Sequence, residues 1–385
     1  MGSEVQDLLK AGKYKEGLEL CRKGLEEHPK DSFLYASKAY AEYSLEQFEQ
    51  SREDSLKAIE IDDKVAWYHL HLGSTYAKLG KDKEALASYD AALALSDKNQ
   101  DATRARTYKS YVYSTNYDYQ KALDESNAAI AIDPGFAQAY VERAWARVGL
   151  QDFDNALKDA EKAIELDPKS SRAFVAKSAV YYRKYDFEQS TVWAKKALEL
   201  DPEDYMALEY LSASYASMGD TDKGLETLDK LLKKFPDNSQ MLAGKAYFLL
   251  TSGKIEEAQE LADRALSVKA VNMSAQLVGS TLAAMKGDRK TAMDLLDTCE
   301  KGCPKAPDVD RSRAIALIAL KDYEGAIKAA DAALVKMPGT ASAYRIKSEA
   351  ESRLGLESEA ERDLKKALDL NYRRPSQLES LFKLL

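Results

Sequence analysis

The residues of this chain that are best suited to chemistry are its three histidines and three cysteines. Cys299 and Cys303 lie four residues apart at the end of an expected helix, where small thiols typically pack between helices. His69 and His71 lie two residues apart, so on a helix their rings cannot face a common metal ion. Because the histidines are far from the cysteines in the sequence, we expect no metal site and no cofactor.

Sequence motifs of catalysis are also missing. The chain has no phosphate-binding GxxxxGKS or GxxxxGKT loop, no GxGxxG turn after a strand, and neither an HExxH nor a GxSxG motif. A repeated pattern, described below, uses the whole chain and leaves no room for a separate catalytic domain. We therefore expect that the protein is not an enzyme.

Charge and composition exclude several classes of partner. The formal net charge is −8, and no basic stretch offers the phosphate contacts that nucleic-acid binding requires. No apolar run approaches the roughly 20 residues that span a bilayer, and the start of the chain lacks the apolar core of a secretory signal. Three cysteines are too few for a disulfide framework. These features predict a cytoplasmic protein that binds neither nucleic acid nor membrane.

The elements that would position any functional side chain come from a repeat of 34 residues, which persists through about eleven copies. When repeat 3 is numbered 1 to 34 from residue 66, small residues recur at positions 8, 20 and 27, as at Gly73, Ala85 and Ala92. Small side chains at fixed sites let two helices approach closely, while larger residues such as Tyr76 fill the space between them. A period of this length predicts stacked helix pairs whose function lies on a surface.

Two kinds of residue divide each repeat into two helices. Proline, which cannot continue a helix, stands at position 32 of seven repeats, and glycine, which favours helix ends, stands near position 15 of six. The prolines are Pro29, Pro134, Pro168, Pro202, Pro236, Pro304 and Pro338, and the glycines are Gly12, Gly80, Gly219, Gly253, Gly287 and Gly355. Each repeat is therefore expected to form two antiparallel helices of about 12–14 residues.

These residues resemble the tetratricopeptide repeat family, whose pattern is W-x2-L-G-x2-Y, then A-x3-F, then P. Repeat 3 has His69 at the tryptophan position, followed by Leu72, Gly73, Tyr76, Ala85 and Tyr89. The resemblance covers essentially the whole chain. It implies an all-α, right-handed superhelical solenoid of about eleven antiparallel helix pairs, with a concave groove lined by the first helix of each pair.

We therefore expect one repeat array over residues 1–374, with repeats that start near residues 1, 32, 66, 103, 137, 171, 205, 239, 273, 307 and 341. Three residues, 100–102, are inserted before repeat 4 and predict a lengthened helix or an altered crossing there. Repeat 1 begins at its own position 4, so its first helix is either clipped or preceded by further residues. Val5, Leu8 and Leu9 are consequently expected to be thinly covered.

Residues 375–385 predict one further helix. Leu378, Leu381, Phe382 and Leu385 are spaced i, i+3, i+4 and i+7, and Pro375 stands in a favoured first-turn position. We expect this amphipathic C-terminal helix to cap the exposed core of the last repeat, since solenoids need caps. A helix that binds a membrane or a partner is the alternative.

Positions 2, 5, 6, 9, 12 and 13 form one stripe on the first helix of each repeat, apart from its packing face. Through repeats 3–8 this stripe is aromatic and mixed in charge, a composition that protein-binding surfaces favour. The candidate contact residues are Trp67, His71, Arg104, Tyr108, Tyr111, Glu142, Trp145, Arg172, Tyr182, Tyr210 and Tyr247. Any one of the aromatic residues could instead pack against the next repeat, and His71 is also a candidate pH-sensitive contact.

The resemblance allows one function to be tested directly. Co-chaperones of this family that hold the carboxylate-terminated tails of heat-shock proteins use a clamp of Lys, Asn and Arg at fixed repeat positions. The nearest window of three repeats has Arg104 in place, but it has Ala36 and Tyr40 where Lys and Asn are needed. The asparagine ladder of the sugar-transferring members is missing as well, so both assignments are disfavoured.

The sequence therefore predicts a non-catalytic interaction scaffold or adaptor that holds an extended or helical segment of a partner protein in its concave groove. Two alternatives remain open. The chain could self-assemble into dimers or filaments through its end repeats, or it could be a regulatory or targeting arm of a larger enzyme complex.

Overall fold

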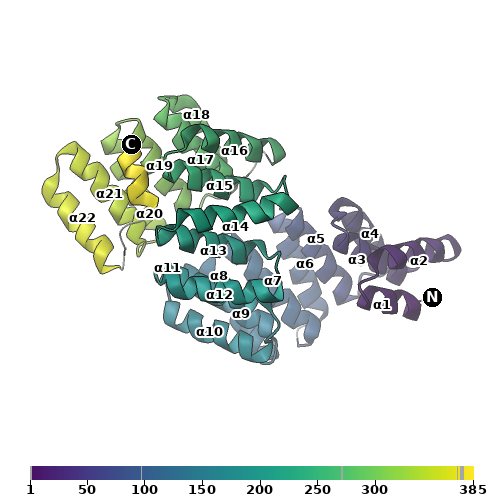
Figure 1. Ribbon diagram of the computed structural model, residues 1–385. Coiled ribbons are helices and arrows are strands. Elements are labelled where there is room, and N and C mark those ends of the chain that lie inside the picture. Colours follow the sequence, from purple (N-terminus) through teal and green to yellow (C-terminus); the bar gives the residue numbers. More distant parts are fainter. Residues whose placement is uncertain (1, 97, 270–271, 371, 373–376) are drawn as a thin grey trace. The chain divides into compact units, whose positions relative to one another are not determined.

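Helices form all the regular structure that this computed structural model describes, which covers residues 2–96, 98–269, 272–370, 372 and 377–385. The chain divides into two compact parts, residues 1–150 (the N-terminal part) and residues 151–385 (the C-terminal part). Within each part, consecutive helices pack against one another (Figure 1). The predicted all-α solenoid of helix pairs is confirmed.

Odd-numbered helices up to α21 are the first helices of the repeats, and even-numbered helices are the second. The helices of the N-terminal part are α1 (Gly2–Lys10), α2 (Tyr14–Glu27), α3 (Ser32–Ser44), α4 (Phe48–Ile61), α5 (Ala66–Lys78), α6 (Asp82–Leu95), α7 (Gln100–Thr115), α8 (Tyr119–Ile132) and α9 (Ala137–Gly149).

The C-terminal part begins with the second helix of repeat 5 and ends with one helix that belongs to no pair. Its helices are α10 (Phe153–Leu166), α11 (Ser171–Arg183), α12 (Phe187–Leu200), α13 (Tyr205–Ser217), α14 (Thr221–Lys234), α15 (Ser239–Thr251), α16 (Ile255–Val268), α17 (Met273–Met285), α18 (Arg289–Gly302), α19 (Pro307–Ala319), α20 (Tyr323–Lys336), α21 (Ala341–Leu354), α22 (Glu357–Asp369) and α23 (Gln377–Leu384).

Small residues explain how closely the two helices of a pair approach. A Cβ atom on Gly73, at position 8, would lie 2.5 Å from the ring of Tyr89 and 3.1 Å from the carbonyl oxygen of Ala85. Ala85 and Ala92, at positions 20 and 27, are buried. The pattern of small residues in the sequence therefore corresponds to direct contact between helices.

Serine at position 8 adds a hydrogen bond to the same contact. Ser110, Ser178 and Ser348 each donate through Oγ to a carbonyl oxygen 2.8 Å away, at position 20 on the second helix of the same repeat. All three serine side chains are buried. The bonds therefore satisfy polar atoms that would otherwise destabilise the interface.

The turn inside each repeat contains a residue with left-handed backbone at position 15. Glycine occupies this position in six repeats, with φ between 70° and 84°. In the other five, φ is 60–62° at Glu46, Tyr117, Gln151, Tyr185 and Lys321. A left-handed backbone costs a residue with a side chain roughly 1 kcal/mol. The packed helices therefore impose the turn even where glycine is not available.

A second regularity links successive repeats. A basic residue at position 7 of one repeat bonds to an acidic residue at position 25 of the repeat before it, with N···O distances of 2.5–3.0 Å. The pairs are Lys109–Asp90, Lys177–Glu161, Lys245–Asp229, Arg313–Asp297 and Lys347–Asp331. Each pair joins two neighbouring repeats at the same place, so together they set the register of the stack.

The insertion before repeat 4 lengthens its first helix. Helix α7 has 16 residues, where α5 and α9 have 13. The side chain of Asn99 caps it by accepting hydrogen bonds from the backbone N–H groups of Asp101 and Ala102. The inserted residues are thus absorbed as additional helix.

Repeat 1 is better covered than the sequence suggests. Val5 is fully buried against Cys21 and Leu34, while Leu8 and Leu9 are half-buried. The expectation of thin coverage is therefore wrong for Val5, because α1 packs on both α2 and α3.

The C-terminal helix α23 falls within the predicted residues 375–385, of which Pro375 and Ser376 lie outside the described residues. Its contacts extend far beyond the last repeat. Leu381 packs among residues of α15, α16 and α17, and Phe382 packs among residues of α19, α20 and α21. The helix therefore covers the first helices of repeats 8–11 instead of capping repeat 11 alone, because its apolar stripe meets several of them at once.

Candidate functional site

The C-terminal part contains a hollow of about 700 Å³ on the side of its first helices. Residues of α11, α13, α15, α17, α19 and α21 line the hollow, and residues of α23 complete its wall. Tyr182 at position 12, Tyr247 at position 9 and Arg311 at position 5 are among them. In this part of the chain, the stripe of the first helices faces inward.

Segments far apart in the sequence meet beside the hollow. Nη2 of Arg183 lies 3.6 Å from the sulfur of Met337, and the rings of Tyr185 and Tyr372 meet edge to face with centroids 6.5 Å apart. The turn between α11 and α12 of repeat 6 therefore contacts residues of repeats 10 and 11, and these contacts help to enclose the hollow.

Three tyrosines give the hollow an aromatic wall. The ring centroid of Tyr182 lies 5.4 Å from that of Phe187 and 5.6 Å from that of Tyr210, so its neighbours fix its position. Burial raises the pKa of Tyr182 and of Tyr185, and it raises the pKa of Tyr247 to about 12. These hydroxyl groups therefore stay protonated at neutral pH and can donate hydrogen bonds to a bound molecule.

The charged groups of the hollow differ in how they are paired. Arg311 bonds to Asp308 and donates to the Ser342 hydroxyl, 2.6 Å away. Among the described residues, no carboxylate pairs with Arg183. Burial raises the pKa of Glu209, so this carboxyl group keeps its proton to a higher pH than usual. The hollow thus offers one guanidinium group without an acidic partner beside neutral hydroxyl groups.

A second aromatic group lies in the N-terminal part, around His71. The ring centroids of Tyr40, Tyr43 and Trp67 lie 5.5–5.9 Å from that of His71, whose Nδ1 forms a 3.1 Å hydrogen bond with the hydroxyl group of Ser55. His71 is only 7% exposed, and within the described part of the chain its Nε2 has no hydrogen-bond partner. Burial lowers its pKa to about 4, which places its titration below the physiological range.

The other candidate residues of the N-terminal part differ in exposure. Tyr111 is 43% exposed, and Arg104, Tyr108 and Trp145 are half-buried. Each presents at least part of its side chain to solvent. Glu142 is buried and accepts a hydrogen bond from Gln138 instead.

In the C-terminal part, the structure brings only some of the candidate residues together. Tyr182 and Tyr247 line the hollow, and Tyr210 packs against Tyr182 without lining it. Arg172 is exposed and lies outside the lining. Two of these four candidates therefore belong to the hollow itself.

The sequence interpretation selected only Tyr182 and Tyr247 from the lining of the hollow, and Arg183, Tyr185 and Arg311 are among the lining residues that it missed. Arg183 at position 13 and Arg311 at position 5 lie on the predicted stripe, so following that stripe through every residue of repeats 6–10 would have found both. Tyr185 stands at the left-handed turn position, off the face of any helix. No signal in the sequence indicates it.

Across the described residues, no group of three or more His, Cys, Asp or Glu side chains could hold a metal ion, and no helix combines the length and apolar character that a bilayer crossing requires. Cys21 and Cys299 are buried, and burial raises their pKa to about 12 and about 11. Both thiols therefore stay protonated at neutral pH and serve as packing residues.

Known proteins share the repeat. Family models described as tetratricopeptide repeat match residues 68–99, 137–170, 215–276 and 299–377. No curated protein matches the chain. A solved tetratricopeptide repeat protein from Parabacteroides merdae ATCC 43184 is 19% identical, with 67% of this chain and 97% of that chain covered and a TM-score of 0.51. The APC/C hetero-tetramer Cut9-Hcn1 is 13% identical, with 99% of this chain and 89% of the matched chain covered and a TM-score of 0.51.

At these identities the two solved structures support the fold alone. The family rests on the repeat models, whose matches together span more than half of the 385 residues. The left-handed turn at position 15 recurs in all eleven repeats, including those that no family model matches. The protein is therefore a member of the tetratricopeptide repeat family.

Proposed function

We propose that this protein is a non-catalytic interaction scaffold that binds a segment of a partner protein in the hollow of its C-terminal part. Tetratricopeptide repeats in general form scaffolds for protein interaction. The observation that carries the assignment is the wall of Tyr182, Tyr185 and Tyr247 beside Arg183. Tyrosine and arginine are among the residues that dominate the binding energy of protein interfaces.

The size and chemistry of the hollow define the segment that it would take. At about 700 Å³ it has the size of a small-ligand pocket and can hold a few side chains, not a folded domain. The tyrosine rings favour an apolar or aromatic side chain, and Arg183 favours a carboxylate. The proposed ligand is a short stretch of a partner that places an apolar side chain next to an acidic one.

The accessible aromatic residues of the N-terminal part are proposed as a second contact surface. The ring of Tyr111 is exposed, and the side chains of Trp145, Tyr108 and Arg104 are half-buried. Because His71 is buried, we propose that it supports the surface around Trp67 without touching the partner.

A carboxylate clamp for heat-shock protein tails is not part of this proposal. The clamp would need basic and amide groups where the chain has Ala36 and Tyr40. Ala36 is buried, and the ring of Tyr40 packs against Tyr14 and Trp67. A terminal carboxylate would therefore meet no donor of the required kind at either position.

Site-specific photo-crosslinking tests the hollow. The full-length protein would carry p-benzoylphenylalanine either at Gln240, which lines the hollow, or at Val335, which lies outside it and is 83% exposed. After irradiation in a native cell extract, we expect a partner adduct from position 240 and none from position 335.

Substitutions in the hollow complete this experiment. Tyr182→Ala combined with Tyr247→Ala should remove the adduct at position 240, since both rings line the site. Tyr205→Ala is the matched control, because Tyr205 is 51% exposed and lies outside the lining. Equal adducts from both positions, no adduct from position 240, or an adduct that survives the double substitution would refute the proposal.

Self-assembly through repeat 1 has lost its main support. That hypothesis relied on thin coverage of Val5, Leu8 and Leu9, and Val5 is fully buried. A molar mass that rises with protein concentration in light scattering would nevertheless restore it.

A further inference from the structure

Helix α23 is held against the first helices of the C-terminal part as a bound peptide would be. Leu381 is 1% exposed in a core formed by repeats 8 and 9, and Phe382 is 5% exposed in a core formed by repeats 10 and 11. Leu378 and Leu385 pack beside them on the same stripe of the helix. Two adjacent residues thus anchor the helix in two separate cores.

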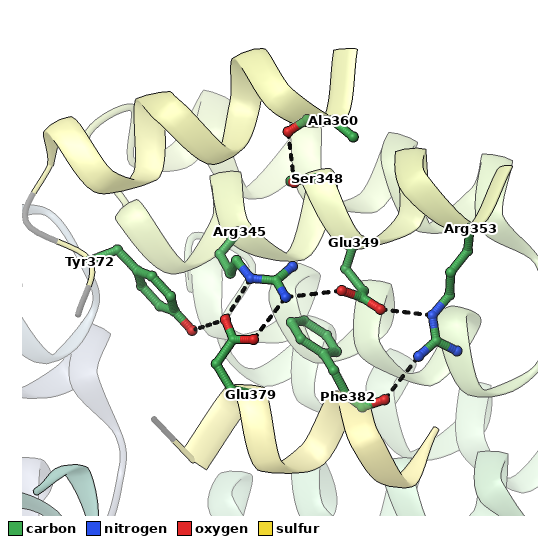
Figure 2. Close-up of polar contacts among 8 residues, drawn as sticks. All are labelled: Arg345, Ser348, Glu349, Arg353, Ala360, Tyr372, Glu379 and Phe382. Atoms are coloured by element: carbon green, nitrogen blue, oxygen red, sulfur yellow. Dashed lines mark hydrogen bonds and ion pairs between the residues drawn. The ribbon is translucent and has the colours of Figure 1, made fainter. Parts of the chain in front are cut away.

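A buried ion pair fixes the position of α23 along this face (Figure 2). Arg345 on α21 is 7% exposed and donates from Nε and Nη2 to the two carboxylate oxygens of Glu379, at 2.6 and 2.9 Å. The hydroxyl group of Tyr372 donates to the same carboxylate at 3.1 Å. Such two-point recognition accepts a carboxylate in one place and one orientation.

The end of α23 is recognised through its backbone. Arg353 donates to the carbonyl oxygen of Phe382 at 2.9 Å, and Glu349 holds Arg353 with another bond of 2.9 Å (Figure 2). The last carbonyl groups of a helix lack partners within the helix and attract cations. Because the contact uses the backbone, any helix that ends at this point can make it.

The length of α23 shows that it depends on this face for its structure. It has eight residues, and a helix this short is unstable by itself in water. It therefore folds where it docks, as helical peptides do when they bind in grooves. Leu378 and Leu381 also belong to the wall of the hollow, so loss of α23 would open the hollow on this side.

We propose that the face formed by α15, α17, α19 and α21 is a binding surface for amphipathic helices with the pattern Leu-Glu-x-Leu-Phe-x-x-Leu. Helix α23 is its occupant in cis, and a partner helix of this pattern displaces it. The partner's apolar residues take the places of Leu378, Leu381, Phe382 and Leu385, and its glutamate binds Arg345. The inference rests on the proposed function in one respect, which is that the partner uses the first-helix face of the C-terminal part.

The test uses the full-length protein and a fluorescein-labelled peptide of residues 372–385. In the chain variant Leu381→Asp with Phe382→Asp, the helix in cis loses both anchors while the face stays intact. Fluorescence anisotropy should show that the peptide binds this variant at least about tenfold more tightly than it binds the wild-type chain, whose own α23 competes. Equal affinity for the two chains, or no binding to either, would overturn the proposal.

Charge reversal identifies the register of the bound helix. A peptide with Glu379→Arg should lose binding to the disabled chain and regain part of it when that chain also carries Arg345→Glu, because the ion pair is restored with its charges exchanged. Recovery is partial because Glu349, which bonds to Arg345 at 3.0 Å, then lies beside a second carboxylate. Glu361→Arg in the chain is the matched control, since Glu361 is exposed on α22 away from this face. Binding that ignores both reversals would also overturn the proposal.

The two proposals fail in different ways. Tyr182→Ala changes the hollow, and Tyr182 belongs to neither core that anchors α23, so this single substitution should weaken the partner crosslink while the peptide affinity stays within about twofold. A peptide that does not bind, together with a crosslink that persists, would refute the helix-binding face alone.

Discussion

At the scale of single residues, two buried carboxyl groups share one arrangement. In repeats 2 and 11, a lysine at position 7 approaches a glutamate at position 11 and an aspartate at position 23. These residues are Lys38, Glu42 and Asp54, and Lys347, Glu351 and Asp363. Burial raises the pKa of Glu42 and of Glu351 to about 7, and the neighbouring aspartate adds to the effect.

Replacing Glu42 with Gln should stabilise the protein at pH 8 and not at pH 4. The carboxyl group titrates near 4.5 in the unfolded chain and near 7 in the native protein, so the native protein loses stability as pH rises through this window. Gln cannot ionise, so the variant should gain about 1 kcal/mol in free energy of unfolding at pH 8. Urea unfolding at pH 4, 6 and 8 measures the gain, which would be equal at all three if the pKa were normal.

For His71 we predict that stability changes with pH in the opposite direction. Its pKa falls from 6.5 to about 4 on folding, so the unfolded chain takes up a proton first and the native protein loses stability as pH falls through this range. His71→Phe removes that loss, although it also removes the bond to Ser55. Between pH 7 and pH 5, the stability difference between wild type and variant should narrow by about 1–2 kcal/mol. His69→Phe, a half-buried ring on the same helix, serves as the control.

At the scale of the helix pair, substitutions at the left-handed turn can measure how much glycine itself stabilises the turn. Lys321→Gly should stabilise the protein by up to about 1 kcal/mol, since it relieves a positive φ of 61° at an exposed site. Gly219→Ala should cost about 1 kcal/mol for the same reason, because φ is 84° there and nothing else lies within 4 Å. Differential scanning calorimetry measures both shifts. Lys328→Gly, within α20, should instead destabilise.

The ion pairs between repeats should differ in energy according to their burial. Lys109 is 7% exposed and bonds to Asp90 at 2.7 Å and to Glu125 at 2.6 Å. Lys109→Ala should therefore cost about 2 kcal/mol, because it removes one of the two cations that pair with Glu125 in a largely buried site and leaves only Arg106, 2.9 Å away. Lys245→Ala should cost less than about 1 kcal/mol, since Asp229 is half exposed. Chemical unfolding measures the free energy of unfolding of both variants. Equal losses of stability would show that burial does not determine how much each ion pair between repeats contributes.

Helix pairs are the part of this structure that sequence reasoning predicts best. Gly73 faces Tyr89 because the helices are close together, and Pro168 stands two residues after the end of α10 because proline cannot continue a helix. Both local causes recur in other repeats at the same positions. The turn at Lys321 is harder to predict, because its left-handed backbone is imposed by the packed helices and not by the residue itself. Periodicity therefore reveals constraints that every repeat shares.

The sequence does not determine which residues line the candidate site or which helices cover it. The stripe of positions on the first helices includes Tyr182 and Tyr247, which line the hollow, and also His71, which is buried. The stripe cannot distinguish these two outcomes, because residues that line a hollow and residues that are fully buried recur with the same spacing. The pattern of Leu381 and Phe382 shows which side of α23 is apolar. It contains no information about which distant helices that side covers, because those contacts occur only once.

At the scale of the whole molecule, each repeat contacts chiefly its neighbours, so the end repeats should open first. Helix α23 changes this expectation at one end, since it packs against α21 and shields it. Hydrogen exchange measured by mass spectrometry should therefore be faster in α1 and α2 than in α21.

A variant distinguishes this shielding from ordinary differences between repeats. Leu381→Asp with Phe382→Asp should accelerate exchange in α21 and leave α1 unchanged, because only the C-terminal end loses its cover. Exchange that stays slow in α21 of this variant would show that α23 does not protect that end.

The contacts of Arg183 with Met337 and of Tyr185 with Tyr372 give the C-terminal part a seam. Parting it breaks no helix and separates no adjacent repeats. One ring pair contributes only about 1 kcal/mol, which is far less than the cost of unfolding a domain. We therefore expect the seam to open more often than the protein unfolds, which would give molecules a route to the interior.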